Sequence, residues 1–222
     1  MLKAVIFDMD GTILDTIQDI AGAVNYILEK YNKPVRTVDE VKNFVGNGLR
    51  RTLELSLGDM ENKDEFIDSI FAEFTGYYKE HSSDNTKPYD GIVEAIRALK
   101  EKGYKTAVVS NKRQEAVEEL CVKFYDGLFD MAIGEQDGLK RKPDPAMVNK
   151  ALDYLGVTKE EAVYIGDSEV DIKTAVNSGL KGIYVSWGFR GTKLLKENGA
   201  KVVVDNPDEL LKVIASCSRD GS

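Results

Sequence analysis

The N-terminal third of the chain begins with one apolar run and then changes to helical spacing. Residues 2–8, LKAVIFD, form a short and nearly continuous apolar run, which is typical of a buried strand. From residue 15 to residue 31, apolar side chains recur every three or four positions, which predicts an amphipathic helix. The same spacing predicts three further helices, in residues 38–45, 48–57 and 63–80. A stretch rich in Ser, Asn, Asp, Pro and Gly, residues 81–91, predicts a linker.

Strand-like and helix-like segments alternate in the rest of the chain. Apolar runs predict strands in residues 105–110, 129–134, 161–167, 181–186 and 200–205. Helical spacing predicts helices in residues 92–102, 114–124, 144–155 and 169–177, and from residue 207 onward. Asp144 and Pro145 are expected to form the cap and first turn of one of these helices. The tail, residues 216–222, is expected to be frayed.

This alternation predicts an α/β fold with two domains. Strands that alternate with helices of this length form a parallel, doubly wound, Rossmann-like sheet. The all-helical segment follows the first strand and precedes the next strand, so it is interpreted as an insertion. We therefore predict an α/β core in residues 1–14 and 86–222 and an inserted α-helical domain in residues 15–85.

The composition is that of an ordinary globular protein and disfavours several classes of function. Of the 222 residues, 42% are hydrophobic and 31% are charged, and the net charge of −8 does not favour binding to nucleic acid. No apolar run reaches the roughly 18 residues of a membrane-spanning helix. Residues 1–7 lack the pattern of a signal peptide. We therefore predict a cytoplasmic protein with no nucleic-acid or membrane partner.

Cysteine and histidine contribute little to the predicted chemistry. Cys121 and Cys217 are far apart and have no C-x-x-C spacing, so neither a zinc site nor a disulfide framework is indicated. His81, the only histidine, lies in the polar linker, which disfavours Ser-His and Cys-His catalysis. A reducing compartment is therefore expected.

The residues that end the predicted strands carry the candidate chemistry. In open parallel sheets, ligands bind beyond the carboxyl ends of the strands, which meet at one edge. The first strand ends at Asp8, and Asp10 follows it closely. A carboxylate beside buried side chains is costly to desolvate unless its charge is compensated, so we expect both residues to be functional. The other strand ends and following loops supply Ser110, Asn111, Lys142, Asp167 and Asp171.

Some of these groups suit a metal ion and others suit a phosphate. Asp8, Asp10 and Asp167 offer hard oxygen ligands of the kind that Mg²⁺ prefers. Lys142 and the Ser110 hydroxyl can hold phosphoryl oxygens, and backbone N–H groups of the turn at Asp10 can add to them. One carboxylate of the D-x-D pair can then attack phosphorus to form an aspartyl-phosphate. The other can protonate the leaving oxygen and later activate water.

Four segments resemble the four motifs of the haloacid dehalogenase superfamily, in the same order. They are FDMDGT at residues 7–12, VVSN at 108–111, KPDP at 142–145 and GDSEVD at 166–171. The resemblance spans the predicted core and implies that the inserted helices form a cap domain. It also implies Mg²⁺ as the cofactor. Because this chain has an aspartate at position 10, phosphate-ester chemistry is expected rather than dehalogenation.

The resemblance also implies roles for individual residues. Asp8 would be the nucleophile, Asp10 the general acid/base, and Asp167 a metal ligand beside Asp8 and the Asp10 carbonyl. Ser110 and Lys142 would hold the phosphate. The full set of phosphate-binding candidates is Thr12, Ser110, Asn111 and Lys142, and Asp171 is a candidate for ordering metal-bound water.

Within this superfamily, the chain resembles the phosphoglycolate phosphatase group. The resemblance rests on DGTILDTIQDIAGAVNYIL, VGNGLRRTL and WGFRGTKLLKENGA. It implies a phosphoric monoester hydrolase that acts on a small phosphorylated metabolite such as 2-phosphoglycolate, as a monomer or weak homodimer. Gly46, Asn47 and Arg50 are candidate substrate-binding residues of the cap, with Arg51 as an alternative to Arg50.

Alternative functions remain on the same scaffold and outside it. An inorganic pyrophosphatase, or a phosphosugar phosphatase or mutase similar to β-phosphoglucomutase, would use the same aspartates. A phosphonoacetaldehyde-type hydrolase would need a Schiff-base lysine in the cap and would lack Asp10. A non-catalytic phospho-receiver would keep Asp8 phosphorylated for minutes or longer. A metabolite-binding protein would show affinity without turnover.

Several candidate residues also have a purely structural interpretation. Ser168 and Asp171 fit a helix capping box. Ser110 and Asn111 could cap the next helix, and Lys142 could be a solvated loop lysine. Trp187 and Phe189 could be core packing, and residues 46–48 could be a plain turn. Asp10 and Gly11 could likewise be only a turn after a strand, and Arg50 and Arg51 could be a solvated helix face.

Overall fold

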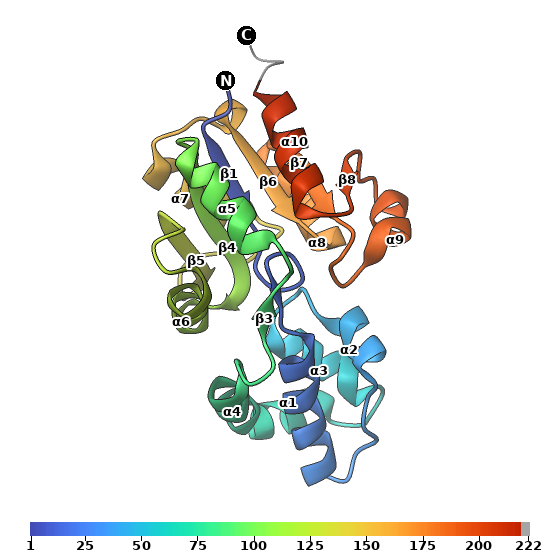
Figure 1. Cartoon of the computed structure of the whole chain (residues 1–222). Coiled ribbons are helices and arrows are strands. Elements are labelled where there is room, and N and C mark those ends of the chain that lie inside the picture. The colour runs from blue at the N-terminus through green and yellow to red at the C-terminus, as the bar shows by residue number, and fades with distance from the viewer. Residues whose placement is uncertain (219–222) are drawn as a thin grey trace. The chain divides into compact units, whose positions relative to one another are not determined.

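The structure is a computed structural model and describes residues 1–218 of the chain. It divides into two compact units (Figure 1). The α/β unit comprises Met1–Leu14 and the chain from Pro88 onward, and the helical unit comprises Asp15–Lys87. The chain thus leaves the α/β unit shortly after its first strand and returns at Pro88, whereas the sequence analysis placed the return at residue 86.

Six parallel strands form the sheet of the α/β unit, in the order β5-β4-β1-β6-β7-β8. They are β1 (Ala4–Phe7), β4 (Lys105–Arg113), β5 (Met131–Glu135), β6 (Ala162–Gly166), β7 (Lys181–Val185) and β8 (Val203–Val204). The register aligns Phe7 of β1 with Val108 of β4 and Ile165 of β6, so these three strands run side by side toward the same edge. The predicted parallel, doubly wound sheet is confirmed.

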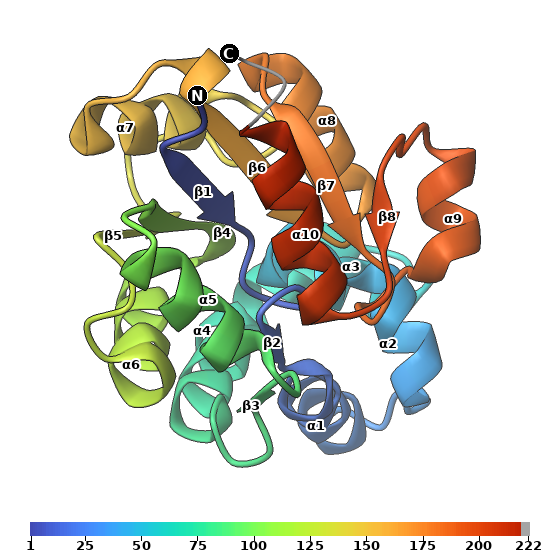
Figure 2. The ribbon, with the colours of Figure 1, turned by 45° about the horizontal axis from the view of Figure 1, so that its top comes forward.

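Helices cover both faces of this sheet (Figure 2). They are α5 (Ile92–Glu101), α6 (Gln114–Tyr125), α7 (Ala146–Leu155), α8 (Glu169–Ser178), α9 (Gly191–Glu197) and α10 (Pro207–Cys217), with a 3₁₀ turn at Lys159–Glu161. Alternate residues of a strand point to opposite faces. Val5 and Phe7 of β1 therefore lie in a core cluster with residues of α5, α6 and α10, and Ala4 and Ile6 in a cluster with residues of α7 and α8. Burial on both faces explains why this strand is continuously apolar.

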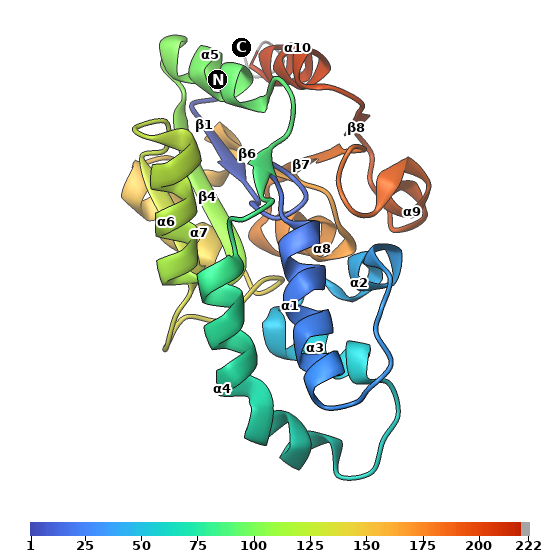
Figure 3. The same cartoon turned by 60° about the horizontal axis from the view of Figure 1, so that its bottom comes forward.

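Four helices form the helical unit (Figure 3). They are α1 (Ile17–Lys30), α2 (Val38–Phe44), α3 (Leu49–Leu57) and α4 (Lys63–His81). α1 packs against the other three, and its apolar stripe, including Val24, Ile27 and Leu28, is fully buried. The two segments that join the units, β2 (Leu14–Asp15) and β3 (Lys87–Pro88), pair with each other as a small separate sheet.

One strand is longer than the sequence predicted, and its extra length matters for the site. β4 continues to Arg113, although the apolar run predicts an end at residue 110. Its pairing with β5 shifts register between Val109 and Arg113, where four steps along β4 match two steps along β5. The polar residues 110–112 therefore lie in the strand at this irregularity. Bulges beside functional sites commonly change the direction of side chains.

Other elements also differ from the sequence-based predictions. β8 has two residues where six were predicted, and α9 was not predicted. α7 begins at Ala146 with Pro145 at its N-cap, although the Asp144 carboxylate does accept the Ala146 N–H. The expected fraying of residues 216–222 is wrong for Ser216 and Cys217, which are helical, and residues 219–222 lie outside the described chain. Among the described helices, none combines the length and apolar character needed to cross a membrane.

Candidate active site

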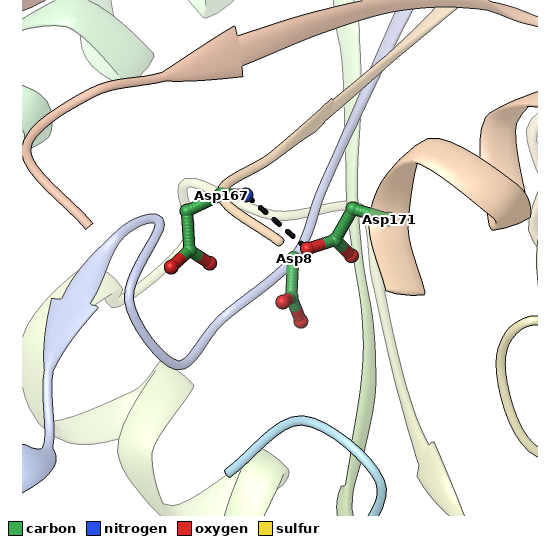
Figure 4. A group of neighbouring side chains, drawn as sticks. All are labelled: Asp8, Asp167 and Asp171. Carbon is green, nitrogen blue, oxygen red and sulfur yellow. Dashed lines mark hydrogen bonds between the residues drawn. The ribbon is translucent and has the colours of Figure 1, made fainter. Parts of the chain in front are cut away.

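Three aspartates gather at the ends of β1 and β6 (Figure 4). Asp8 directly follows β1, and its N–H donates to the Ile165 carbonyl of β6 over 2.8 Å. Asp167 directly follows β6, and Asp171 lies in the first turn of α8. All three are buried, and one carboxylate oxygen from each lies within 4.8 Å of the others. The structure thus assembles residues that the sequence placed at separate strand ends.

The Lys142 side chain is buried between two of these carboxylates. Its Nζ lies 2.7 Å from Asp8 Oδ1 and 2.9 Å from Asp171 Oδ1, and it donates to the Tyr164 hydroxyl over 2.9 Å. Asn111 holds the Lys142 backbone, since its amide oxygen accepts the Lys142 N–H and its amide nitrogen donates to the Lys142 carbonyl. The side chain is 2% exposed, so the interpretation as a solvated loop lysine is wrong.

Asp171 is held by donors on both carboxylate oxygens. Its Oδ1 accepts from Lys142 and from the Tyr164 hydroxyl, each at 2.9 Å. Its Oδ2 accepts from the N–H groups of Asp167 and Ser168 and from the Ser168 hydroxyl. Burial by itself raises the pKa of Asp171, but Lys142 and these hydrogen bonds outweigh burial, and the pKa lies below its usual value. The predicted capping box between Ser168 and Asp171 is confirmed, and Asp171 also ties α8 to Lys142.

The other two carboxylates carry negative charge that the chain compensates only in part. Burial and the charge of Asp171 raise the pKa of Asp8 well above its usual value, against the opposing effect of Lys142. Burial and Asp171 also raise the pKa of Asp167 to about 7, against the Phe189 N–H, Arg190 and Thr12. Each shift has the sign expected when like charges are brought together away from water.

This group fits a divalent cation. A cation beside Asp8 and Asp167 would stabilise their ionised forms against burial and the charge of Asp171, which raise their pKa values. Carboxylate oxygens are the ligands that Mg²⁺ prefers. An oxygen of Asp171 lies equally close to the group, but five donors already occupy the Asp171 oxygens. Asp8 and Asp167 are therefore the side chains that would hold the ion, with Asp171 acting through the backbone of Asp167.

The loop after β7 supports Asp167. The Phe189 N–H donates to Asp167 Oδ2 over 2.7 Å, and the Thr12 hydroxyl donates to Asp167 Oδ1 over 3.1 Å. Gly188 approaches so closely that a Cβ there would overlap the Asp167 side chain and the Gly11 carbonyl. Trp187 packs against the core, and its indole N–H also donates to the Thr12 carbonyl over 3.1 Å. Core packing is thus only part of the role of this loop.

Asp10 lies outside the group of three and has its own lysine. Its Oδ1 is 2.9 Å from Lys112 Nζ in an ion pair whose side chains are 16% and 3% exposed. The three carboxylates that share the metal-sized space are Asp8, Asp167 and Asp171. The predicted part of Asp10 in metal binding, through its carbonyl oxygen, stays a prediction.

The other phosphate-binding candidates have hydrogen-bond partners within the chain. The Ser110 hydroxyl accepts the Lys112 N–H over 3.2 Å. α6 begins after Arg113 without a side-chain cap, so the interpretation of Ser110 and Asn111 as helix caps is wrong. In the turn at Asp10, the N–H groups of Gly11 and Thr12 donate to the carbonyls of Leu14 and Met9. The predicted contact of this turn with a phosphate stays a prediction.

The three substrate-binding candidates of the cap lie in the helical unit. Gly46 and Asn47 form the turn between α2 and α3, which matches the plain-turn interpretation. Gly46 and Gly48 have φ of 120° and 84°, values that favour glycine. In α3, the Arg50 guanidinium is 2.7 Å from Asp68 and lies over the Phe71 ring. Arg51 pairs with Glu54, and the role of either arginine toward a substrate stays a prediction.

Two buried residues of the site escaped the sequence analysis. Tyr164 of β6 donates to Asp171 and accepts from Lys142, and burial raises its pKa well above the usual value. Lys112 pairs with Asp10. A weak signal for both exists in the sequence, because a tyrosine and a lysine each lie close to the predicted end of an otherwise apolar strand.

Known proteins resemble this chain over nearly its whole length. The haloacid dehalogenase-like hydrolase family matches residues 5–185. The chain is 34% identical to the phosphoglycolate phosphatase of Aquifex aeolicus over 218 residues, which are 96% of this chain and 97% of that protein. It is 29% identical to pyrophosphatase PpaX of Bacillus cereus over 219 residues, with 98% and 99% of the two chains covered.

A solved structure extends the likeness to the fold. It comes from Lactobacillus delbrueckii subsp. bulgaricus and is described as an inferred phosphoglycolate phosphatase. It matches with a TM-score of 0.90 at 39% identity, covering 96% of this chain and 98% of the other. Together with the motifs at the strand ends and the inserted helical unit, these matches show that the chain belongs to the haloacid dehalogenase-like hydrolase family.

Proposed function

We propose that the chain is a Mg²⁺-dependent phosphatase that hydrolyses a small phosphomonoester, such as 2-phosphoglycolate, through an aspartyl-phosphate on Asp8. One observation carries the proposal: the buried Asp8 carboxylate lies 2.7 Å from the Lys142 ammonium and beside a second buried carboxylate, Asp167. A carboxylate that has one fixed cation and a group suited to a second cation beside it supports the proposal that Asp8 attacks phosphorus. The name of the Aquifex aeolicus relative supports phosphoglycolate as the substrate.

The first half of the reaction transfers the phosphoryl group to Asp8. A carboxylate oxygen of Asp8 forms a bond to phosphorus while the bond from phosphorus to the leaving oxygen breaks. The Lys142 ammonium and the Ser110 hydroxyl hold the phosphoryl oxygens, whose charge would otherwise repel Asp8. Asp10 gives its proton to the leaving oxygen. A Mg²⁺ ion held by Asp8 and Asp167 would supply further positive charge to the phosphoryl oxygens.

The second half of the reaction regenerates Asp8. Asp10, now ionised, takes a proton from a water molecule, and the water oxygen attacks the phosphorus of the aspartyl-phosphate. The acyl phosphate bond breaks, phosphate leaves, and Asp8 returns to its carboxylate form. Each turnover therefore uses Asp10 once as an acid and once as a base, and consumes one water molecule.

Inorganic pyrophosphate is the second candidate substrate. Pyrophosphatase PpaX of Bacillus cereus, which covers 98% of this chain, supports it. The same aspartates would act on it, because a bond from phosphorus to oxygen again breaks and the leaving group is inorganic phosphate. The proposal of a small substrate is therefore common to both candidates, and an assay separates them.

The test is phosphate release from 2-phosphoglycolate, pyrophosphate, a hexose phosphate and a nucleotide, each with Mg²⁺ and with a chelator. We expect chelator-sensitive release with the highest kcat/KM on 2-phosphoglycolate. Preference for pyrophosphate would overturn the substrate and keep the mechanism. Isomerised hexose phosphate with little free phosphate would indicate a mutase. Absence of release from every compound would overturn the phosphatase proposal.

Substitution of the nucleophile tests the mechanism. Asp8→Asn should lower kcat by about three orders of magnitude or more, as loss of a nucleophile does in other enzymes. Lys100→Met is a suitable control, because Lys100 pairs with Asp130 before β5, at the opposite end of the strands from Asp8. Near-normal turnover by folded Asp8→Asn protein would contradict an aspartyl-phosphate on Asp8.

A further inference from the structure

The backbone around Asp10 is fixed by hydrogen bonds. The Gly11 N–H donates to the Leu14 carbonyl over 2.8 Å, and Asp10 and Leu14 form an isolated bridge. The Tyr125 hydroxyl donates to the Ile13 carbonyl over 2.6 Å. These contacts fix the Cα of Asp10, but a short acidic side chain still rotates about its own bonds. The direction of the Asp10 carboxylate therefore depends on a side-chain partner.

Lys112 supplies that partner from the neighbouring strand. Its Nζ donates to Asp10 Oδ1 over 2.9 Å, across 102 positions of sequence. The Lys112 side chain is 3% exposed, so its long stem is held by surrounding atoms rather than by water. It lies in the part of β4 where the register with β5 shifts, and its backbone N–H donates to the Ser110 hydroxyl. Hydrogen bonds thus hold the backbone on both sides of the Lys112–Asp10 pair, in β4 and in the turn after β1.

Two buried lysines contact the two aspartates of the proposed mechanism, one lysine for each aspartate. Lys142 contacts Asp8, Asp171 and Tyr164, and Lys112 contacts Asp10. In the proposed mechanism, Lys142 contacts the carboxylate that bonds to phosphorus, whereas Lys112 contacts the carboxylate that transfers protons. Both lysines lie beyond the apolar parts of their strands and loops, at the same edge of the sheet.

We propose that Lys112 is a positioning residue that fixes the direction of the Asp10 carboxylate for proton transfer to the leaving oxygen. The inference rests on the proposed function, in which Asp10 is the general acid. It predicts that loss of Lys112 lowers kcat/KM most for esters whose leaving oxygen needs a proton. An alkoxide is a poor leaving group and needs that proton, whereas 4-nitrophenolate leaves without it.

Kinetics on three esters test the inference. Lys112→Met should lower kcat/KM about 10- to 100-fold on 2-phosphoglycolate and on ethyl phosphate, within the range of general acid catalysis. On 4-nitrophenyl phosphate, kcat/KM should change less than about 3-fold. Lys112→Arg, which keeps a donor, should restore part of the loss. An equal loss on all three esters would indicate a structural role, and a loss confined to 2-phosphoglycolate would indicate contact with the substrate carboxylate. Either result overturns the inference.

A double-mutant cycle tests whether Lys112 acts through Asp10. In an Asp10→Asn background, Lys112→Met should have little further effect on kcat/KM for ethyl phosphate, because residues that act as a unit are not additive. Additive losses would overturn the inference. Lys100→Met is the matched control, since it removes a lysine from an ion pair remote from Asp10.

A crystal structure of Lys112→Met separates this inference from the proposed function. The Asp10 carboxylate should leave its position or occupy more than one rotamer, while Asp8 and Asp167 stay in place. An unchanged, single Asp10 rotamer would overturn the inference, whatever the activity. If the native protein released no phosphate from any ester, the proposed function would fail, and the Asp10 rotamer would still decide whether Lys112 positions it.

Discussion

Two buried residues of opposite charge determine the electrostatics of the site. Lys142 is surrounded by Asp8, Asp171 and the Tyr164 hydroxyl, and their attraction outweighs the effect of burial and raises its pKa above the usual value. Asp167 instead accepts hydrogen bonds from the Phe189 N–H and the Thr12 hydroxyl, and the charge of Arg190 also opposes the rise of its pKa. The ammonium of Lys142 thus stays charged, whereas the negative charge of ionised Asp167 is only partly balanced by its neighbours.

Lys142→Met should strongly destabilise the protein. The substitution keeps most of the side-chain volume but leaves two buried carboxylates without their cation, and breaking a buried pair this way costs about 3–5 kcal/mol. Lys100→Met removes a half-exposed pair and should cost less than about 1 kcal/mol. Urea denaturation of both variants measures the difference. Similar stability of the two variants would contradict the buried ion pairs described here.

Asp167 should make the metal-free protein less stable as pH rises. Its pKa in the folded state is about 7, above the ordinary value of 3.8, so the folded protein binds more protons than the unfolded chain between these values. Stability therefore falls as pH rises from about 4 to 7. Asp167→Asn should reduce this slope, to which the raised pKa of Asp8 also contributes, and should melt at a higher temperature than the native protein at pH 7.5 in chelator. A lower melting temperature at pH 7.5 would contradict the raised pKa.

At the scale of elements, loops at the carboxyl ends of the strands hold the site in place. The β7 loop at Trp187, Gly188 and Phe189 contacts both the turn after β1 and the carboxylate after β6. The end of β4, where the register with β5 shifts, supplies Asn111 and Lys112, which contact Lys142 and Asp10. The site therefore depends on the close approach of three backbone segments that are far apart in sequence.

Gly188→Ala should weaken metal binding without unfolding the α/β unit. A Cβ at this position overlaps the Asp167 side chain and the Gly11 carbonyl, so the loop must move away from Asp167. Loss of such support commonly lowers metal affinity about 10- to 100-fold. Isothermal calorimetry with Mg²⁺ measures the change. Gly76→Ala in α4, where a Cβ meets no atom, is the control, and equal Mg²⁺ affinity in both variants would contradict the role of the loop.

Element positions were predictable where the local pattern of apolar residues decides them. β1, β6 and the amphipathic helices follow from apolar runs and helical spacing alone. The end of β4 was not predictable, because Ser110, Asn111 and Lys112 are polar and stay in the strand through pairing with β5. The strand-end aspartates were predictable from parallel topology. Lys112 and Tyr164 were not assigned, because their contacts join residues brought together only by folding.

For the whole molecule, the acidic group makes stability depend on metal and proton together. All three carboxylates belong to the α/β unit, on segments that precede and follow the insertion. A cation that binds only the folded chain stabilises it by mass action, by about 2.7 kcal/mol at 100 times its Kd. Protons compete for the same oxygens, because the pKa values of Asp8 and Asp167 are raised.

Mg²⁺ should therefore raise the melting temperature more at pH 8 than at pH 5. At pH 5 the Asp167 carboxyl group, whose pKa is raised to about 7, is mostly protonated, whereas at pH 8 it is ionised and available to the ion. Differential scanning fluorimetry with Mg²⁺ or a chelator, at constant ionic strength, provides the measurement. An equal effect at the two pH values, or an equal effect of Na⁺, would contradict metal binding by this group.

The interior place of β1 in the sheet has a consequence for synthesis of the chain. All four residues of β1 are fully buried in the folded protein, and both neighbours, β4 and β6, come after the helical insertion. A ribosome that adds about 5–20 residues per second needs on the order of 5–20 s to proceed from β1 to β4. During that interval the whole helical unit is synthesised, while β1, the strand that leads to Asp8, has no neighbouring strand at either edge. The nascent chain thus completes its inserted part before the sheet that surrounds the insertion begins to form.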